Sequence, residues 1–185
     1  QIINGLKHLK KYNWVHRDLK PENIVITNID PINVKIIDFQ FATNEKFSSR
    51  SVGTLSYMSP QVLENLYYDT HKNDIWCLGV MLFSMYTYNR PYSIPNKLDD
   101  ANYYCDWLMA IKDKNWKRYW LSMERILKSN KINTSLLVNG NLPIEFKDII
   151  QKMLSWDQKN RCTLKEVLVH PFLEKEESPR CCIIL

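Results

Sequence analysis

Apolar residues recur along the chain with two different periods, and the change between them predicts the order of its elements. Residues 2–9 carry isoleucine and leucine at helical spacing, which is typical of one face of an amphipathic helix. Two β-branched runs, 23–26 and 34–37, are separated by the turn-like residues 28–31. This pattern predicts a helix followed by a small β-hairpin.

The second half of the chain has mainly helical patterns. Residues 73–86 are apolar on nearly all sides, which predicts a helix buried in the core, and Asn73 and Asp74 are the expected caps of its start. Pro143 and Pro171 mark helix boundaries. Further helices are expected at 103–111, 116–127, 144–154 and 163–169.

Two segments show neither period. Residues 15–23 are polar and interrupted by Pro21, which indicates a loop. Residues 38–61 form a run of 24 residues without clear periodicity. A structureless loop of that length is uncommon in a compact domain unless it has a function.

Composition and charge exclude several classes of protein. Of the 185 residues, 45% are hydrophobic and 24% are charged, as in ordinary globular proteins. The net charge of +5 is spread along the chain, and the densest basic stretch, 112–118, is interrupted by Asp113 and Trp116. Such a stretch is typical of a solvated helix face, so we expect no nucleic-acid partner.

Cysteine usage and the termini bear on the compartment. The five cysteines are odd in number and include no C-x-x-C pair, which favours a reducing compartment. No apolar run approaches the ~18 residues of a spanning helix, and no charged-then-apolar leader opens the chain. We therefore expect a cytoplasmic protein. Because the chain opens at Gln1 within an amphipathic pattern, as if a helix had been cut, we expect the sequence to be a fragment.

Four polar residues in these segments suit phosphoryl transfer. Asp18 can act as a base, and Lys20 supplies a cation two residues later. Asn23 and Asp38 offer oxygen ligands on either side of the hairpin. The reaction needs an oriented hydroxyl nucleophile, Mg²⁺ held by oxygen ligands, and positive charge against the developing negative charge. The hairpin would bring Asn23 and Asp38 beside the same metal ions.

The sequence around these residues resembles a protein kinase. Residues 16–23, His-Arg-Asp-Leu-Lys-Pro-Glu-Asn, match the catalytic-loop signature of that family at each defining position. Further motifs follow in the family's order: Asp-Phe-Gln at 38–40, Val-Gly-Thr at 52–54, Tyr-Met-Ser-Pro-Gln at 57–61, Asp-Ile-Trp-Cys-Leu-Gly at 74–79, Asn-Arg at 160–161 and His-Pro-Phe at 170–172. The resemblance is to eukaryotic-type serine/threonine protein kinases and covers nearly the whole chain.

The resemblance implies a protein-kinase-like α+β fold. Residues 1–173 would be the mainly α-helical C-terminal lobe of the kinase domain, with a small β-hairpin near the active site, and 174–185 a tail. The family's Gly-rich loop, strand lysine and helix glutamate are missing before Gln1. We expect the lobe that carries them to be a partner in cis, and the chain alone to be an inefficient catalyst.

The resemblance also implies roles for individual residues. Asp18 would be the catalytic base that accepts the substrate hydroxyl proton, and Lys20 would lie near the transferred phosphate of ATP. Asn23 and Asp38 would hold two Mg²⁺ ions. Thr54 would brace Asp18 and Lys20, and this lysine and threonine resemble serine/threonine rather than tyrosine kinases.

Regulation by phosphorylation is a further implication. In the family, an arginine at the position of Arg17 pairs with a phosphate on the segment matching 38–61, where a charge of about −1.5 to −2 orders the loop. Ser48, Ser49 and Ser51 are the candidate phosphorylation sites, and ordinary polar loop residues are the alternative interpretation.

Two residues are expected to support the catalytic loop from the core. Asp74, at the start of the buried helix, would accept hydrogen bonds from the loop backbone, and a helix N-terminus also favours a carboxylate. His16 is expected to be a packed structural residue rather than a proton shuttle, because Asp18 already fills the role of the base.

Two positions depart from the family's pattern. Gln40 stands where the family has a glycine, and a side chain forced to positive φ there costs on the order of 1–2 kcal/mol. Gln61 replaces a glutamate that forms a buried ion pair with the arginine matching Arg161, and losing one partner of such a pair costs roughly 3–5 kcal/mol. The amide of Gln61 can still accept a hydrogen bond, so we expect the segment 38–61 to be held less firmly.

The C-terminus carries one more signal. Cys182 and the Ile-Ile-Leu after it fit a prenylation box, and Cys181 is available for a second lipid. This pattern predicts association with a membrane surface, with a chance apolar tail as the alternative.

The expected function is transfer of the ATP γ-phosphate to Ser and Thr hydroxyls of protein substrates, with Mg²⁺. A pseudokinase used as a binding module is the alternative; the two departures favour it, and the four intact residues of the phosphoryl-transfer site oppose it. A small-molecule kinase is disfavoured by the long segment 38–61, which in protein kinases shapes a peptide-binding surface. Trp107, Trp116 and Trp120 are expected to adjoin that surface, although such aromatics are more often core.

Overall fold

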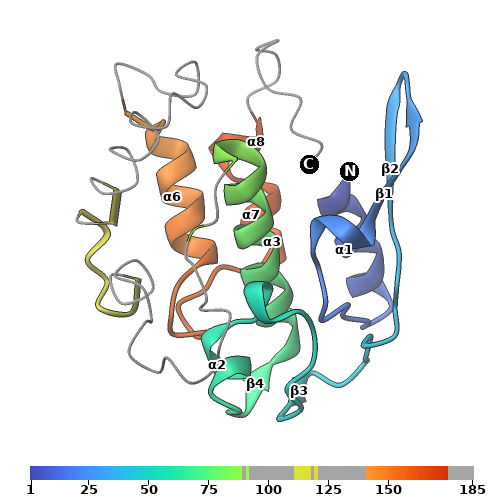
Figure 1. The fold of residues 1–185 in the computed structure, drawn as a ribbon, viewed down its shortest axis with the longest axis horizontal. Coiled ribbons are helices and arrows are strands. Elements are labelled where there is room, and N and C mark those ends of the chain that lie inside the picture. The colour runs from blue at the N-terminus through green and yellow to red at the C-terminus, as the bar shows by residue number, and fades with distance from the viewer. Residues whose placement is uncertain (89–90, 92–110, 118, 121–140, 175–185) are drawn as a thin grey trace.

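The computed structural model describes residues 1–88, 91, 111–117, 119–120 and 141–174, which form a mainly helical domain around helix α3 (Figure 1). Helix α3 packs against α6, while α1 contacts the hairpin strand β2 and helix α7. The elements, in chain order, are α1 (Ile2–Lys11), η1 (Pro21–Asn23), β1 (Ile24–Ile29), β2 (Ile32–Ile36), β3 (Phe47–Ser48), η2 (Leu55–Tyr57), α2 (Pro60–Leu63), β4 (Tyr68–Asp69), α3 (Thr70–Thr87), α6 (Ile144–Met153), α7 (Leu164–Leu168) and α8 (Pro171–Glu174).

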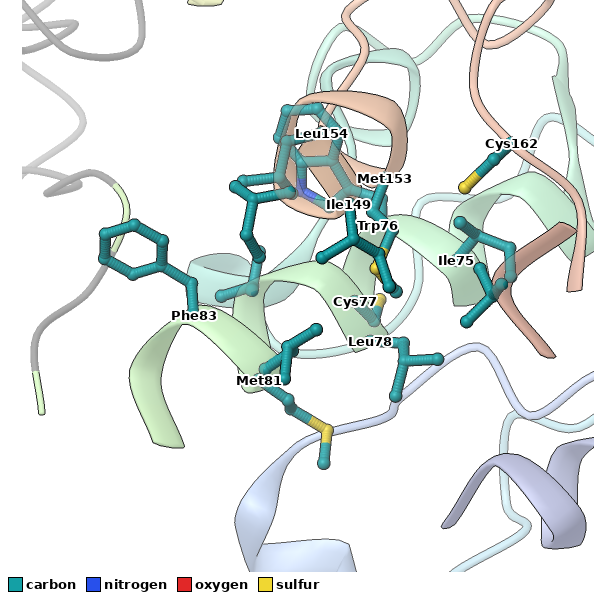
Figure 2. Close-up of a cluster of buried hydrophobic side chains, with 14 of the residues drawn as sticks. Ile75, Trp76, Cys77, Leu78, Met81, Phe83, Ile149, Met153, Leu154 and Cys162 are labelled. Atoms are coloured by element: carbon teal, nitrogen blue, oxygen red, sulfur yellow. The ribbon is translucent and has the colours of Figure 1, made fainter. Parts of the chain in front are cut away.

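Helix α3 is buried along most of its length, as its sequence predicts. Apolar side chains leave it on nearly all sides and meet those of α6 around Met153 and Leu154 (Figure 2). A helix without a polar face is stable only inside a core. At Gly79, a Cβ atom would lie 2.8 Å from Cβ of Met153, so the glycine allows the two helices to approach closely.

The start of α3 lies earlier than predicted, and its cap is a different residue. Asp69 is the N-cap, and its carboxylate accepts hydrogen bonds from the amides of His71 at 3.0 Å and Lys72 at 3.2 Å. The expectation that Asn73 and Asp74 cap the helix was therefore wrong. Their side chains lie past the first turn and accept hydrogen bonds from other segments, as Asn73 does from the amide of Ser59 at 3.3 Å.

The predicted hairpin is confirmed, with longer strands than expected. Strands β1 and β2 pair antiparallel with Ile24 opposite Ile36, and both of these residues pack partly against the core. Ile26 and Ile29, further along β1, are exposed. The end of the hairpin that holds Asn23 and Asp38 is thus the end fixed to the helical core.

The segment 38–61 contains more regular structure than its sequence predicts. Strand β3 pairs with β4, and η2 and α2 follow it, each element being two to four residues long. Elements this short show no period, so the sequence gives no signal for them. The backbone of Thr43 also bridges Val15, with N–O distances of 2.8 and 3.0 Å, which fixes this segment beside the loop 15–23.

The predicted helix at 144–154 is confirmed as α6, and the one at 163–169 as α7. Thr163 and Glu166 form a reciprocal capping box at the start of α7. Within the described residues, no helix has the length and apolar character needed to cross a membrane.

Helices are also expected at 103–111 and 116–127, but most of these residues, including Trp107, lie outside the described part of the chain. Trp120 is buried and Trp116 packs beside it in the core, as aromatics at helical spacing usually do. The prenylation signal at Cys181 and Cys182 also lies outside the described residues.

Candidate active site

The polar loop 15–23 is fixed to the buried helix α3 through one carboxylate. Asp74 accepts a hydrogen bond from the backbone amide of His16 and another from that of Arg17, each at 2.8 Å. Burial is the largest influence on this carboxyl and raises the pKa of Asp74 to about 6, against the lowering effect of the two amide hydrogen bonds. The two amides therefore hold the loop backbone in one place.

His16 completes this support from inside the core. It is fully buried, and its Nε2 lies 2.9 Å from the carbonyl oxygen of Ile37. Its Nδ1 accepts a hydrogen bond from the amide of Asp18 at 3.2 Å, and its ring makes an edge contact with that of Phe39. All of these are packing and positioning contacts.

Asp18 lies at the centre of the candidate site, with 2% of its surface exposed. Its Oδ2 accepts hydrogen bonds from Nζ of Lys20 at 2.8 Å and from Nδ2 of Asn23 at 3.2 Å. Its Oδ1 is buried beside Gly53, where a Cβ atom would lie 3.5 Å from it. Burial alone would raise the pKa of Asp18, but Lys20 and Thr54 outweigh burial and hold it below its ordinary value. Asp18 is therefore ionised, as a base that orients a hydroxyl must be.

Lys20 and Thr54 join the loop 15–23 to the segment 38–61. Nζ of Lys20 donates to Oγ1 of Thr54 at 2.6 Å as well as to Asp18. The residue before Thr54 must be glycine: Gly53 has φ +109°, and a Cβ there would lie 2.6 Å from the carbonyl oxygen of Arg17. The threonine can reach the lysine because its backbone passes this close to the loop.

Asn23 and Asp38, the residues predicted to hold Mg²⁺, both carry side-chain oxygens and lie at the same end of the hairpin. Asn23 donates from Nδ2 to the carbonyl oxygen of Asp18 at 2.8 Å, which turns its Oδ1 away from that base. The amide of Ile37 donates to the carbonyl oxygen of Asn23 at 2.9 Å. This contact places Asp38, the next residue, near Asn23.

Two oxygen donors fit a magnesium ion that keeps waters and phosphate oxygens as its other ligands. The described residues contain no cluster of three or more His, Cys, Asp or Glu that could hold a metal by themselves.

Gln40 does not adopt the backbone conformation that its position predicts. The residue at positive φ is Asp38, at +62°, and Gln40 is not among the residues with positive φ. The expected strain at Gln40 was therefore wrong, because the left-handed turn falls two residues earlier, on a residue type that tolerates it. The side-chain amide of Gln40 instead lies 3.5 Å from Oδ2 of Asp38.

Arg17 reaches from the loop into the segment 38–61. Its Nε donates to the carbonyl oxygen of Phe41 at 2.6 Å, and its Nη1 lies 3.4 Å from Oγ of Ser48. Ser48 is buried, whereas Ser49 and Ser51 are exposed. The structure thus brings the arginine to one of the three candidate serines, and leaves the other two accessible to solvent.

Gln61 and Arg161 meet, as their family positions suggest. Nη2 of Arg161 donates to Oε1 of Gln61 at 2.9 Å, and Nε2 of Gln61 donates to the carbonyl oxygen of Trp156 at 2.6 Å. The glutamine therefore uses both ends of its amide, and it links α2 to the segment before α7.

Several positioning contacts could not be read from the sequence. The bridge between Val15 and Thr43 and the acceptor of Arg17 on Phe41 are backbone groups, which leave no side-chain pattern. Asp69 could have been recognised as the cap of α3, because aspartate is common one residue before a helix. It also belongs to strand β4, and a two-residue strand leaves no pattern in the sequence.

Comparison with known proteins shows the family to which the chain belongs. A family model described as "Protein kinase domain" matches residues 1–173. A probable serine/threonine-protein kinase of Dictyostelium discoideum is 31% identical over 179 residues, which are 95% of this chain and 9% of that protein. The Aurora kinase of Saccharomyces cerevisiae is 30% identical over 178 residues, 94% of this chain and 40% of the yeast protein.

A third relative extends the range of organisms. Calcium-dependent protein kinase 4 of Plasmodium falciparum is 29% identical over 179 residues, 94% of this chain and 29% of that protein. The chain thus spans less than half the length of each of these three curated relatives.

Proposed function

The chain belongs to the protein kinase domain family, and from that premise we propose that it is the phosphoryl-transfer part of a serine/threonine protein kinase. The observation that carries the proposal is the arrangement at Asp18. This carboxylate is ionised, and Lys20 and Asn23 hold one of its oxygens in place. That is the arrangement required of a base that orients a substrate hydroxyl.

In this proposal each residue has a separate task. Asp18 orients the hydroxyl of the substrate protein and accepts its proton. Lys20, fixed by Asp18 and Thr54, places a positive charge where negative charge develops on the transferred phosphoryl group. Asn23 and Asp38 would hold the Mg²⁺ ions of MgATP, which neutralise the phosphate oxygens when bound. The protein's contribution is positioning and electrostatics.

The choice of Ser and Thr as acceptors is supported by the contact between Lys20 and Thr54 at 2.6 Å. This pair resembles serine/threonine kinases, and the Dictyostelium relative reported above is named as a probable kinase of that kind. The pseudokinase alternative is weaker, because the four residues that phosphoryl transfer needs are present at one site.

We propose further that the chain is the C-terminal lobe of its kinase domain and that a second lobe covers the site. Phe39 is 47% exposed, and Val25 and Ile37 are also exposed, although they flank the buried residues of the loop 15–23. Large apolar side chains beside a polar site favour a covering surface. A lobe that carries the remaining ATP-binding groups would supply it.

We also propose phosphorylation of the segment 38–61 and lipidation of the C-terminus, both on the basis of the sequence. Ser48 already meets Arg17, whereas the hydroxyl of Ser51 donates to the carbonyl oxygen of Val62. Attachment of a lipid at Cys182, with Cys181 as a second site, would bring the protein from the cytoplasm to a membrane surface. Mass spectrometry of the protein from its own cells tests both modifications.

The activity is tested by incorporation of labelled γ-phosphate into protein substrates by the full-length protein with MgATP. We expect Asp18→Asn to lower the rate by about 10³-fold or more, on the scale of general-base and positioning effects. Asp113→Asn, at an exposed acid in the described part of the chain, is the matched control and should leave the rate unchanged. Equal labelling by wild type and Asp18→Asn, both shown to be folded, would overturn the proposal.

A further inference from the structure

A cavity of about 400 Å³ lies where α1, α3 and α7 meet, near the ends of these helices that approach β3. Its volume is within the range of small-molecule sites in proteins, roughly 300–1,000 Å³. The lining comes from five segments: the second half of α1, residues 13–14, Lys46, the start of α3 and the start of α7. Of the residues of the candidate active site only Asp74 takes part, so this cavity is a separate feature.

One wall of the cavity is apolar. Leu6, Ile75 and Leu164 are buried core residues, and Leu9 is packed against them. Trp14 also lines the cavity and is 44% exposed. Such a wall favours the hydrocarbon part of a ligand, because its burial removes apolar surface from water.

The rest of the lining is charged, and its lysines outnumber its carboxylates. Lys10, Lys46 and Lys72 belong to it together with the carboxylates of Asp69 and Asp74. Both carboxylates are occupied by backbone amides, Asp69 at the cap of α3 and Asp74 at the loop 15–23. In the described part of the chain, neither Lys10 nor Lys46 pairs with a carboxylate. The cavity therefore offers cations whose charge is not already balanced by a direct partner.

His71 lies within reach of the same charges. Burial holds its pKa below the ordinary value; Asp69 is the next influence and opposes the shift, and Lys10 and Lys46 add to it. A neutral imidazole at this place can donate or accept one hydrogen bond. The two lysines are thus close enough to the half-buried histidine to influence a group inside the cavity.

We propose that this cavity binds a small amphipathic monoanion, a carboxylate with an apolar chain or ring. The apolar part lies against Leu6, Leu9 and Ile75, and the carboxylate faces Lys10 and Lys46. The ligand contacts residues 13–14 and Lys46, which precede the loop 15–23 and the strand β3, so its binding stabilises the arrangement of both segments. The proposal does not depend on the proposed phosphoryl transfer.

Decanoate is the probe, and decanol is its uncharged control. Binding to the full-length protein is measured by calorimetry below the concentration at which decanoate forms micelles. We expect saturable binding of decanoate, about tenfold tighter than that of decanol, since two exposed lysines act together on the carboxylate. Leu9→Gln should weaken both probes, because it places a polar group in the apolar wall.

The lysines provide a matched test. Lys10→Gln and Lys46→Gln should each weaken decanoate binding about three- to fivefold and leave decanol binding unchanged. Lys7→Gln, on the same helix but outside the cavity lining, is the control and should change neither. Three results would overturn the proposal: no saturable binding to the folded protein, equal binding of the acid and the alcohol, or equal losses in Lys7→Gln and Lys10→Gln.

Discussion

Arg161 donates from Nη2 to the side-chain oxygen of Gln61 at 2.9 Å, with both residues buried. The same guanidinium donates to the carbonyl oxygens of Lys72 and Ser155 and lies 4.9 Å from the ring centre of Trp76. These acceptors are neutral oxygens. The resemblance to the family implies a buried ion pair at these two positions. In this protein, charge-assisted hydrogen bonds to neutral oxygens take its place.

Gln61→Ala is expected to lower the free energy of unfolding by about 2–3 kcal/mol. It removes an acceptor from a buried guanidinium and a donor from the carbonyl oxygen of Trp156, and hydrogen bonds to charged groups contribute roughly 1.5–3 kcal/mol. Urea unfolding measures the change. Gln61→Glu keeps the acceptor and adds a charge, but loses the donor, so it should lie within about 1 kcal/mol of wild type. An alanine variant as stable as wild type would contradict this view of the network.

Gly53→Ala is expected to disturb the site itself. The new Cβ would lie 2.6 Å from the carbonyl oxygen of Arg17, at a φ of +109°, and the left-handed conformation alone costs about 1–2 kcal/mol. We expect a loss of stability of about 2–4 kcal/mol and a lower rate of phosphate transfer, because Thr54 moves with the backbone.

Gly5→Ala is the control for this substitution. Its Cβ would meet only the end of the Ile36 side chain, and alanine is favoured over glycine in a helix by about 1 kcal/mol. Equal losses of stability in the two variants would show that the close approach at Gly53 has no special role.

The raised pKa of Asp74 should make the free energy of unfolding depend on pH. Its pKa is raised from 3.8 to about 6 by burial, so the folded state binds more protons than the unfolded state between these values. Its contribution to stability is therefore fullest below about pH 4 and decreases as pH rises through 6, by on the order of 3 kcal/mol. Asp18, Asp148 and Glu166 have lowered pKa values and act in the opposite direction.

Asp74→Asn isolates this contribution, because asparagine does not titrate. The variant should be less stable than wild type, since its one side-chain oxygen replaces two that accept amides. The difference between the two proteins should shrink from pH 4 to pH 7 when unfolding by urea is followed at each pH. A constant difference would show that Asp74 is ionised throughout.

Gln40→Gly tests the backbone conformation at the position where the sequence departs from the family. Since Gln40 is not at positive φ, glycine there should destabilise the protein by about 0.5–1 kcal/mol through the entropy of the unfolded chain. The opposite sign, a gain of about 1–2 kcal/mol in urea unfolding, would mean that Gln40 carries the strain of a left-handed turn.

The elements that could be predicted from the sequence are those whose pattern extends over enough residues, and the site residues that could be predicted are those that lie within one motif. Helix α3 could be predicted because its apolar run is long, and the hairpin because two β-branched runs flank a turn. Strand β3 could not, because a pair of residues has no period. The strain assigned to Gln40 was wrong for a different reason: a motif gives residue types, whereas the φ values that place the turn at Asp38 are set by contacts with His16 and its neighbours.

The anchoring of the loop 15–23 on Asp74 has a consequence for hydrogen exchange. Loop amides normally exchange quickly, since they open without disturbing the core. The amides of His16 and Arg17 donate instead to a carboxylate inside α3, so they can exchange only when the most deeply buried helix opens. In a deuterium-exchange experiment these two loop amides should be protected as long as those of Leu78 and its neighbours, while the amide of the exposed Ser49 is labelled early. A segment can thus lack regular structure and still belong to the last part of the molecule to open.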